Sequence, residues 1–297
     1  MGKIIIIGAS GFLGKKITDN LIERELICVD LNDKPLDLTL NNESRWVKAD
    51  YTKDDISDFL KSITLKDTTL IHLATTQFPS EAELNIGKDI KDNVLATLML
   101  FDKFYSYGGE KIIFASSSGA MYSGKNKKNI ESEAKPYSIY ACTKLTVENY
   151  LRAISSRYKK RAISLRIANP FDLHNLEIQK HGVVPLFYNI VKKGGTISLY
   201  NYGIQKDFVY IEDVVDAFEK AITYCGEKDT FNISTNTSIS LEEIIVLFEK
   251  KLNSAVKITY TNEVYPVMTH GAICNRTANQ ELKWRPTLLL NAAINDL

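Results

Sequence analysis

A tyrosine and a lysine stand four residues apart near the middle of the chain, at Tyr140 and Lys144. Apolar residues recur around them at helical spacing, so both side chains are expected on one face of a helix. An ammonium beside a phenol favours the phenolate, which lowers the pKa of the tyrosine and makes the phenol a usable proton donor and acceptor. Tyr140 is therefore the candidate acid/base residue, although a pair at this spacing also arises by chance on helix surfaces.

Three serines, Ser116, Ser117 and Ser118, follow the apolar stretch Ile112–Ala115. Open α/β sheets place their ligands at the carboxyl ends of strands, where these serines are expected. A hydroxyl at this position can hold a substrate hydroxyl or carbonyl while Tyr140 moves the proton. The alternative is a polar exit from a strand into a loop.

A glycine-rich turn follows the first apolar run, Lys3–Ile7, and opens an amphipathic stretch. Such a turn lets backbone N–H groups approach a pyrophosphate and lets the helix pack closely on the sheet. The spacing is G-x-x-G-x-x-G rather than the G-x-G-x-x-G dinucleotide fingerprint, so a purely structural turn stays open. The cofactor-binding candidates in this turn are Gly8, Gly11, Phe12, Leu13 and Gly14.

A carboxylate at the end of the second apolar run, Asp30, lies sixteen residues after Gly14. A carboxylate there accepts hydrogen bonds from both hydroxyls of the adenosine ribose and repels a 2′-phosphate. NAD is therefore expected rather than NADP, unless Asp30 merely opens a solvated loop. Further cofactor-binding candidates follow later strands and are Asp50, Tyr51, Leu73 and Ala74.

The residues named so far need a parallel sheet to position them. Continuous apolar runs alternate with helical patterns in the first half of the chain, as in strands buried on both faces. This alternation predicts an α/β fold with a doubly wound, Rossmann-like parallel sheet and a smaller C-terminal substrate lobe. The expected domains are 1–168 for the dinucleotide, joined by part of 205–235, and 169–297 for the substrate. The predicted strands are Lys3–Ile7, Leu26–Val29, Thr69–Leu73, Lys111–Ala115 and Ala162–Ile167, and the main helical stretches are Phe12–Arg24, Ile90–Tyr105 and Ser138–Tyr158.

Composition limits the function classes. The 297 residues carry 37 Lys and Arg against 36 Asp and Glu, a net charge of +1. A chain so balanced lacks the single-sign field of a dedicated nucleic-acid or membrane-surface binder. Four isoleucines before Gly8 are too few for a signal-peptide core or a membrane span. The four cysteines stand apart from one another and from histidines, so we expect reduced thiols in a cytoplasm, with neither a metal site nor a disulfide.

The sequence resembles the extended short-chain dehydrogenase/reductase family, in its NAD-dependent epimerase/dehydratase group acting on nucleotide sugars. The resemblance implies Ser118, Tyr140 and Lys144 as catalytic residues, with Lys144 also binding the nicotinamide ribose. It further implies that Asn93 contacts the cofactor and Asn169 the substrate phosphates. The matching motifs, besides the residues named above, are His72-Leu73-Ala74, Ser118 with Tyr122, Leu165-Arg166-Ile167, Asn169-Pro170, Asp207-Phe208-Val209-Tyr210, Asp213-Val214-Val215-Asp216-Ala217 and Glu281-Leu282-Lys283-Trp284-Arg285-Pro286.

Three departures from the family pattern bear on the substrate. Lys206 and Tyr265 stand where the family usually has arginines, so the binding of a diphosphate is altered, and Arg276 and Lys180 are the candidates to compensate. Gly119-Ala120 replaces the Asp-Glu pair of the family's dehydratases, which argues against elimination of water. The substrate-binding candidates are Ser117, Ser118, Asn169, Lys206 and Arg276.

Two reactions fit these residues: reduction of a 4-keto-6-deoxy nucleotide sugar by NADH, and 4-epimerisation of a nucleotide sugar. A chain of 297 residues is shorter than the family's typical 4-epimerases, which favours the reductase narrowly. A sensor that binds a dinucleotide without catalysis is the non-enzyme alternative, and the presence of both Tyr140 and Lys144 argues against it. The resemblance also implies a homodimer that pairs the stretches Ile90–Tyr105 and Ser138–Tyr158 with their symmetry mates.

Overall fold

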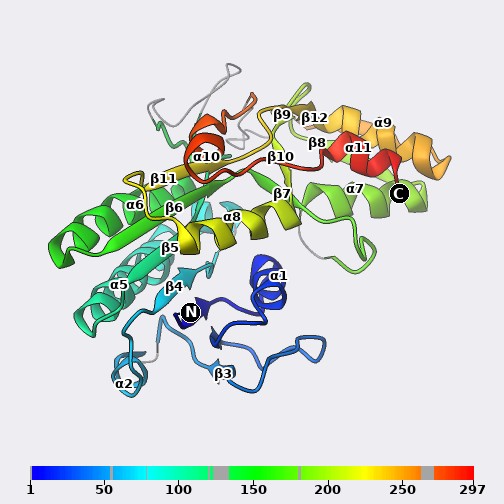
Figure 1. Cartoon of the computed structure of the whole chain (residues 1–297). Coiled ribbons are helices and arrows are strands. Elements are labelled where there is room, and N and C mark those ends of the chain that lie inside the picture. Colours follow the sequence, from blue (N-terminus) through cyan, green and yellow to red (C-terminus); the bar gives the residue numbers. More distant parts are fainter. Residues whose placement is uncertain are drawn as a thin grey trace. The chain divides into compact units, whose positions relative to one another are not determined.

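The computed structural model describes residues 2–53, 56–77, 79–119, 121–122, 134–179, 182–261 and 271–297 (Figure 1). Ala120, Lys180 and Tyr265, named above, lie outside these residues. The chain divides into two compact units, which are treated separately. Unit 1 comprises Met1–Ser117, Pro136–Arg166 and Val215–Phe231, and unit 2 comprises Ser118–Lys135, Ile167–Val214 and Asn232–Leu297.

A seven-stranded sheet has the order β11-β6-β5-β4-β1-β2-β3. Neighbours among β1 to β5 pair in parallel, for example Ile4 with both Leu26 and Thr69. The inner strands are buried along their whole length, which explains their continuous apolar runs. The prediction of a doubly wound parallel sheet is confirmed. The strands are β1 (Ile4–Ile7), β2 (Leu26–Asp30), β3 (Arg45–Lys48), β4 (Thr69–His72), β5 (Lys111–Ser117), β6 (Arg161–Ile167) and β11 (Thr230–Ile233).

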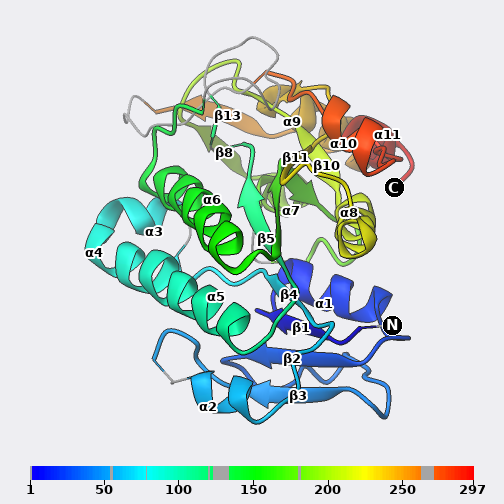
Figure 2. The same ribbon diagram turned by 60° about the vertical axis from the view of Figure 1, so that its left-hand side comes forward.

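Helices cover both faces of this sheet. In Figure 2, α5 and α6 lie side by side on one face and α1 lies on the other. Phe101 and Phe104 of α5 and Val147 and Leu151 of α6 are fully buried in one apolar core with strand residues such as Ile112. The helices up to residue 158 are α1 (Phe12–Asn20), α2 (Ile56–Lys61), α3 (Pro79–Leu84), α4 (Ile86–Asp89), α5 (Ala96–Ser106) and α6 (Ile139–Tyr158), and α8 (Ile211–Thr223) follows later in the sequence.

Helix α6 carries the tyrosine and lysine singled out by their spacing. Ser138 begins it as the N-cap, because its side chain accepts a hydrogen bond from the N–H of Ala141. Lys159 ends it in the left-handed conformation, with φ of 53°. Val147 and Leu151 anchor its buried face to the core. The first turns of α6 are thereby fixed against the sheet.

The predicted helix Ile90–Tyr105 contains a π-helical segment, η1 (Ile90–Leu95), before it continues as α5. Asp92 and Asn93 on this segment are buried. The wider turn was not predicted, because a π segment has no apolar period of its own. Such segments often occur at functional sites.

A buried lysine ties β5 to the end of α8. The Nζ of Lys111 donates to the carbonyl oxygens of Ala221, Ile222 and Tyr224 at 3.1, 2.6 and 2.9 Å. These carbonyls lie at or just past the end of the helix, where they lack helical partners and carry partial negative charge. Burial lowers the pKa of Lys111. Lys111 thus caps the end of α8, although it precedes these carbonyls by 110 or more residues in the sequence.

Unit 2 is built around a second apolar core. Residues of α7, α9 and α11, including Phe187, Phe248 and Ile294, are buried together. Ser240 and Glu243 form a capping box that begins α9, each side chain accepting the other's backbone N–H at 3.0 and 2.7 Å. The elements are α7 (Val183–Lys193), α9 (Leu241–Leu252), α10 (Arg276–Glu281) and α11 (Leu290–Asn295), with strands β7 (Asn169–Phe171), β8 (Thr196–Leu199), β9 (Gln205–Lys206), β10 (Phe208–Tyr210), β12 (Ile239–Ser240) and β13 (Lys257–Tyr260).

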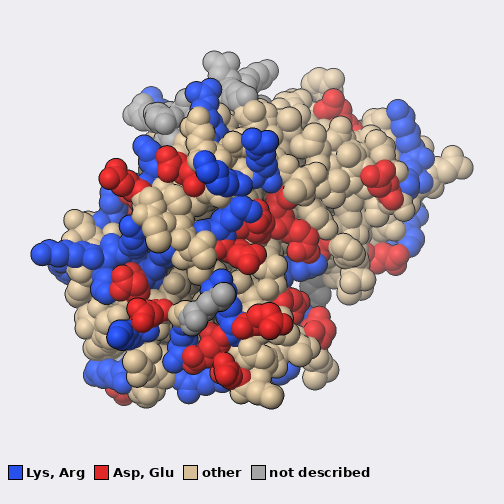
Figure 3. Space-filling model, viewed as in Figure 1, with Lys and Arg blue, Asp and Glu red and all other residues tan. Residues whose placement is uncertain are grey.

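On the face shown in Figure 3, side chains of Lys and Arg are interspersed with those of Asp and Glu. Within the described ranges, none of the helices has the length and apolar character needed to cross a bilayer. All four cysteines are free thiols.

Candidate active site

The glycine turn between β1 and α1 requires glycine at two of its three positions. Gly8 has φ of +89°, and a Cβ there would lie 2.8 Å from the backbone nitrogen of Ala74. At Gly14 a Cβ would collide with the carbonyl oxygen of Gly8. Gly11 is the N-cap of α1, and within the described ranges no side chain caps this helix. The first N–H groups of α1 are therefore left for an anionic group, with Phe12 exposed and Leu13 half-buried at the helix start.

Asp30 lies at the end of β2, directly beside the glycine turn. One carboxylate oxygen accepts the N–H of Ser10 at 2.8 Å, and the other accepts the backbone and side-chain N–H of Asn32 at 3.0 and 3.1 Å. The side chain is largely buried, so these bonds hold its orientation. A carboxylate oxygen accepts more than one hydrogen bond, which leaves capacity for ribose hydroxyls.

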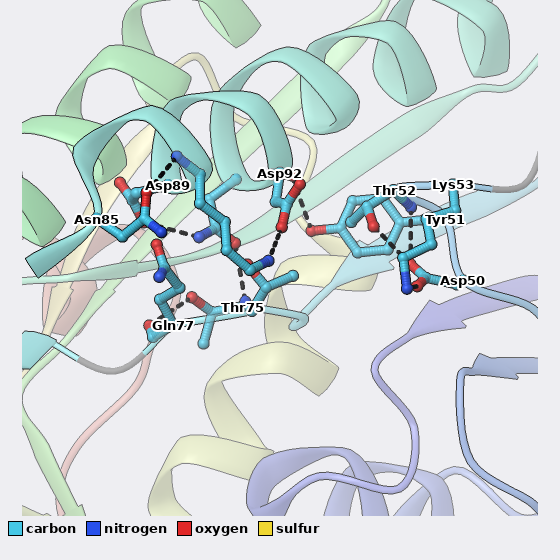
Figure 4. Close-up of polar contacts among 12 residues, drawn as sticks. Asp50, Tyr51, Thr52, Lys53, Thr75, Gln77, Asn85, Asp89 and Asp92 are labelled. Carbon is cyan, nitrogen blue, oxygen red and sulfur yellow. Dashed lines mark hydrogen bonds and ion pairs between the residues drawn. The ribbon is translucent and has the colours of Figure 1, made fainter. Parts of the chain in front are cut away.

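The next candidates follow β3 and β4. Asp50 accepts hydrogen bonds from the backbone N–H and the hydroxyl of Thr52 at 3.0 and 2.6 Å, as Figure 4 shows. Tyr51 points away from it, with its hydroxyl 3.5 Å from the carbonyl oxygen of Asp92. The N–H groups of Leu73 and Ala74 both donate to Ile7, at 2.9 and 3.1 Å. Leu73 and Ala74 thus lie beside the end of β1.

Both polar groups of Asn93 are bonded within the protein. Its carbonyl oxygen accepts the N–H of Thr76 at 2.9 Å, and its amide donates to Asp89 at 2.8 Å. Asn93 therefore joins η1 to the loop that follows β4. The polar groups of its side chain therefore hold these two segments together and are not left without partners.

Tyr140 and Lys144 lie on one face of α6, as predicted, with Nζ 5.6 Å from the centre of the tyrosine ring. Nζ donates to the carbonyl oxygen of Ala115 at 3.1 Å and lies 4.8 Å from the centre of the Phe114 ring. Loss of hydration raises the pKa of Tyr140 to about 12, a hydrogen bond from Ser117 opposing the shift. The expected fall in the tyrosine pKa is therefore wrong for this structure. The ammonium donates its hydrogen bond to a strand carbonyl, and loss of hydration of the phenol is the largest effect on the tyrosine pKa.

Lys144 is buried, and loss of hydration lowers its pKa to about 8, against the opposing effects of Asp89 and Glu148. Glu148 lies one turn further along α6 and forms a buried ion pair with Arg166 of β6, at 2.7 Å. The guanidinium donates from two nitrogens to this carboxylate. Glu148 is thereby neutralised close to the lysine.

The three serines after β5 have different surroundings. The hydroxyl of Ser116 donates to Glu148 at 2.5 Å, so this serine belongs to the buried ion pair. Ser117 is half-buried and opposes the rise in the pKa of Tyr140. Ser118, in unit 2, is fully buried and its N–H donates to Ile167 at 2.9 Å. Its hydroxyl has no partner within the described part of the chain, as expected of a group that holds a ligand.

The other substrate candidates also lie in unit 2. The side chain of Asn169 donates to the carbonyl oxygen of Asp207 at 2.7 Å. Lys206 lies in β9, opposite Ile239 of β12, and burial lowers its pKa. Arg276 is exposed at the start of α10. Asn169 and Lys206 thus both lie next to Asp207, and in the described part of the chain no contact joins Arg276 to either of them.

Three residues around the Tyr140–Lys144 pair were not predicted: Asp89, Thr143 and Glu148. Thr143 donates its hydroxyl to the buried carboxylate of Asp89. No local pattern in the sequence points to Asp89, because its burial depends on Thr143, 54 residues later. The Glu148 signal is its spacing of four residues from Lys144.

The chain is similar to known proteins in sequence and in fold. The model of the NAD dependent epimerase/dehydratase family matches residues 4–234. The dTDP-4-dehydro-6-deoxyglucose reductase of Escherichia coli is 35% identical over 305 residues, covering 99% of this chain and 96% of the relative. A UDP-glucose 4-epimerase of Mycolicibacterium smegmatis is 26% identical over 314 residues, covering 98% and 96%. A crystal structure of UDP-glucose 4-epimerase with UDP-glucose from Thermotoga maritima has a TM-score of 0.86 at 25% identity, covering 98% and 96%.

Proposed function

The chain belongs to the NAD dependent epimerase/dehydratase family, and from this premise we propose that it reduces the 4-keto group of a 4-keto-6-deoxy nucleotide sugar with NADH. Membership confirms the resemblance drawn from the motifs and makes the protein an enzyme of the short-chain dehydrogenase/reductase type. The observation that supports reduction most is the 35% identity to a dTDP-4-dehydro-6-deoxyglucose reductase over nearly the whole of both chains.

In the proposed reaction Tyr140 gives a proton to the oxygen at carbon 4. The Ser118 hydroxyl donates a hydrogen bond to the same substrate oxygen, and Ser117 supports the phenol. Lys144 supplies positive charge beside the tyrosine and binds the nicotinamide ribose. The bound NADH supplies the hydride. We propose that unit 1 binds the dinucleotide and that unit 2 supplies the substrate lobe, with Asn169, Lys206 and Arg276 toward the diphosphate.

The residues present fit a dinucleotide. Gly8 and Gly14 allow the turn and the start of α1 to pack closely against the neighbouring backbone, where a Cβ would collide, and the uncapped N–H groups of α1 are suited to a pyrophosphate. Asp30 would hold the adenosine ribose and Asp50 with Tyr51 the adenine edge. Isolated thiols persist in a reducing compartment, so we place the enzyme in the cytoplasm.

The test is incubation of the purified protein with NADH and a 4-keto-6-deoxy nucleotide sugar, dTDP-linked first, while NADH absorbance is followed. We expect one NADH oxidised per ketone reduced. The second candidate is 4-epimerisation, which the similarity to UDP-glucose 4-epimerases favours. Conversion of a 4-hydroxy nucleotide sugar to its epimer without added cofactor, with no NADH consumed by the ketone, would establish the epimerase instead.

Asp30 is expected to make NADH bind more tightly than NADPH. Bringing a phosphate dianion against this carboxylate should cost on the order of 1 to 3 kcal/mol, or about 5- to 150-fold in Kd. Fluorescence titration with both reduced cofactors measures the ratio, and Asp30→Ser should narrow it. The control is Asp33→Ser, because Asp33 is exposed and pairs with Lys48. Equal affinities in the unaltered protein would contradict the assignment of Asp30.

We propose a homodimer formed through the outer faces of η1, α5 and α6. Leu95 and Met99 lie one turn apart and are 55% and 51% exposed, so they form a neighbouring pair of exposed apolar side chains. Light scattering should give twice the chain mass of 33.5 kDa, and Leu95→Lys with Met99→Lys should halve it. Leu36→Lys, at an exposed apolar residue outside these helices, is the control. A monomer at micromolar concentration in the unaltered protein would refute the dimer.

A further inference from the structure

Asp89 is a fully buried carboxylate at the end of α4. One oxygen accepts the hydroxyl of Thr143 and the other accepts the amide of Asn93 at 2.8 Å. Within the described part of the chain this carboxylate forms no ion pair. Figure 4 shows Asp89 and Asp92 on the same helical segment, and Asp92 differs in being paired with Lys88. A buried carboxylate without a cation is costly, so its retention calls for a reason.

The two hydrogen bonds connect three elements of unit 1. Thr143 lies on α6 immediately before Lys144, and Asn93 lies on η1. Through Asn93 the connection reaches Thr76 in the loop after β4. Asp89 therefore fixes the turn of α6 that carries the lysine against the helical segment beside it.

The charges that face Lys144 can be named from each element around it. Tyr140 and Glu148 share its helix, and Glu148 is neutralised by Arg166 of β6. His72 of β4 is buried, and its pKa is lowered to about 3, so it is neutral. On the side of β5 the ammonium donates to a carbonyl oxygen and lies over the face of a phenyl ring. Among the described residues Asp89 is the other carboxylate whose charge acts on the lysine, and it forms no ion pair there with a Lys or Arg.

We propose that Asp89 is a positioning residue that acts as the buried countercharge of Lys144 and keeps this lysine cationic at neutral pH. The proposal rests on the role proposed above for Lys144. Burial lowers the pKa of Lys144 to about 8, and Asp89 is the larger of the two groups that oppose this fall. Without Asp89 the pKa of the lysine would fall further, toward neutrality. Tyr140 would then lack the positive charge beside it.

The test follows the titration of Lys144 directly, with no cofactor or substrate. The protein is labelled with ¹³C at the lysine ε-carbons, and Lys144→Met assigns the signal. We expect a midpoint near pH 8 in the unaltered protein and a midpoint about one to two pH units lower in Asp89→Asn. Asp92→Asn is the matched control and should leave the midpoint unchanged, because Asp92 is paired with Lys88. Asp89→Glu keeps the charge and should restore most of the midpoint.

Thr143→Val separates charge from hydrogen bonding, because it removes a donor to Asp89 and keeps the carboxylate. Its midpoint should stay close to that of the unaltered protein. This variant also decides the question if Asp89→Asn does not fold: a midpoint lowered in Thr143→Val by a unit or more would overturn the countercharge. An unchanged midpoint in folded Asp89→Asn would overturn it as well. Absence of reductase activity would instead refute the proposed function and would leave the titration result standing.

Discussion

Replacing Tyr140 by Phe is expected to lower turnover by about 10² to 10⁴, the usual contribution of one positioned acid/base group. The ring stays in place near Lys144, so packing and cofactor affinity should change little. Only the hydroxyl that exchanges the proton is lost. The measurement is single-turnover oxidation of bound NADH by the 4-keto sugar, with the Kd for NADH determined alongside.

Tyr107→Phe is the matched control, since this tyrosine follows the end of α5 and has no proposed role. Ser118→Ala should slow the same step by a smaller factor, because its buried hydroxyl contributes a hydrogen bond rather than the proton. Full turnover by Tyr140→Phe in a step limited by chemistry would show that the proton follows another route.

The protein is expected to lose stability in acid through His72. This side chain is buried against Tyr51, Phe101 and Phe114, and burial, with Lys144 adding to it, lowers its pKa to about 3. The unfolded chain takes up a proton below about pH 6.5, whereas the folded protein does not. The contribution is therefore fully present above pH 6.5 and falls by about 1.4 kcal/mol per pH unit down to about pH 3.

His72→Phe keeps a ring in the cluster and removes the titration. Urea unfolding of both proteins between pH 7.5 and pH 5 measures the free energy of unfolding of each. The difference between the two proteins isolates the contribution of His72, because the other titrating groups contribute equally to both. The unaltered protein should lose about 2 kcal/mol more than the variant between pH 6.5 and pH 5. Parallel curves for the two proteins would mean that His72 takes up its proton in the folded state.

Much of the sheet could be predicted from apolar runs. The strands β1, β2, β4, β5 and β6 are buried on both faces, so each shows as a continuous apolar stretch. Short strands such as β9 and β12, of two residues each, are too brief to show any alternation. The segment η1 looked like the start of an ordinary helix, because the sequence pattern of a single wide turn differs little from that of an α-helix.

The site was predictable where one residue type must occupy a local position. Gly8, with a positive φ, and the pair Tyr140 and Lys144 are of this kind. Asp89 is not, because an aspartate in an amphipathic stretch usually faces solvent. Its burial depends on Thr143, 54 residues later, which no local pattern could show. The direction of the pKa shift of Tyr140 could not be predicted for a related reason. Hydration of the phenol depends on packing, which the four-residue spacing does not reveal.

The discontinuity of unit 1 has a consequence for synthesis on the ribosome. Its last stretch, Val215–Phe231, supplies the acceptors for Lys111 and the first two residues of β11, the edge strand that adjoins β6. A nascent chain that ends at Arg166 therefore contains the Lys111 ammonium without its carbonyl acceptors. The edge of β6 that later pairs with β11 is also unpaired. Contacts across 110 residues form slowly, and until then the growing chain is prone to associate with others. Fragments that end before Phe231 should accordingly need chaperones to stay unassociated, whereas in the full-length chain β11 pairs with the edge of β6.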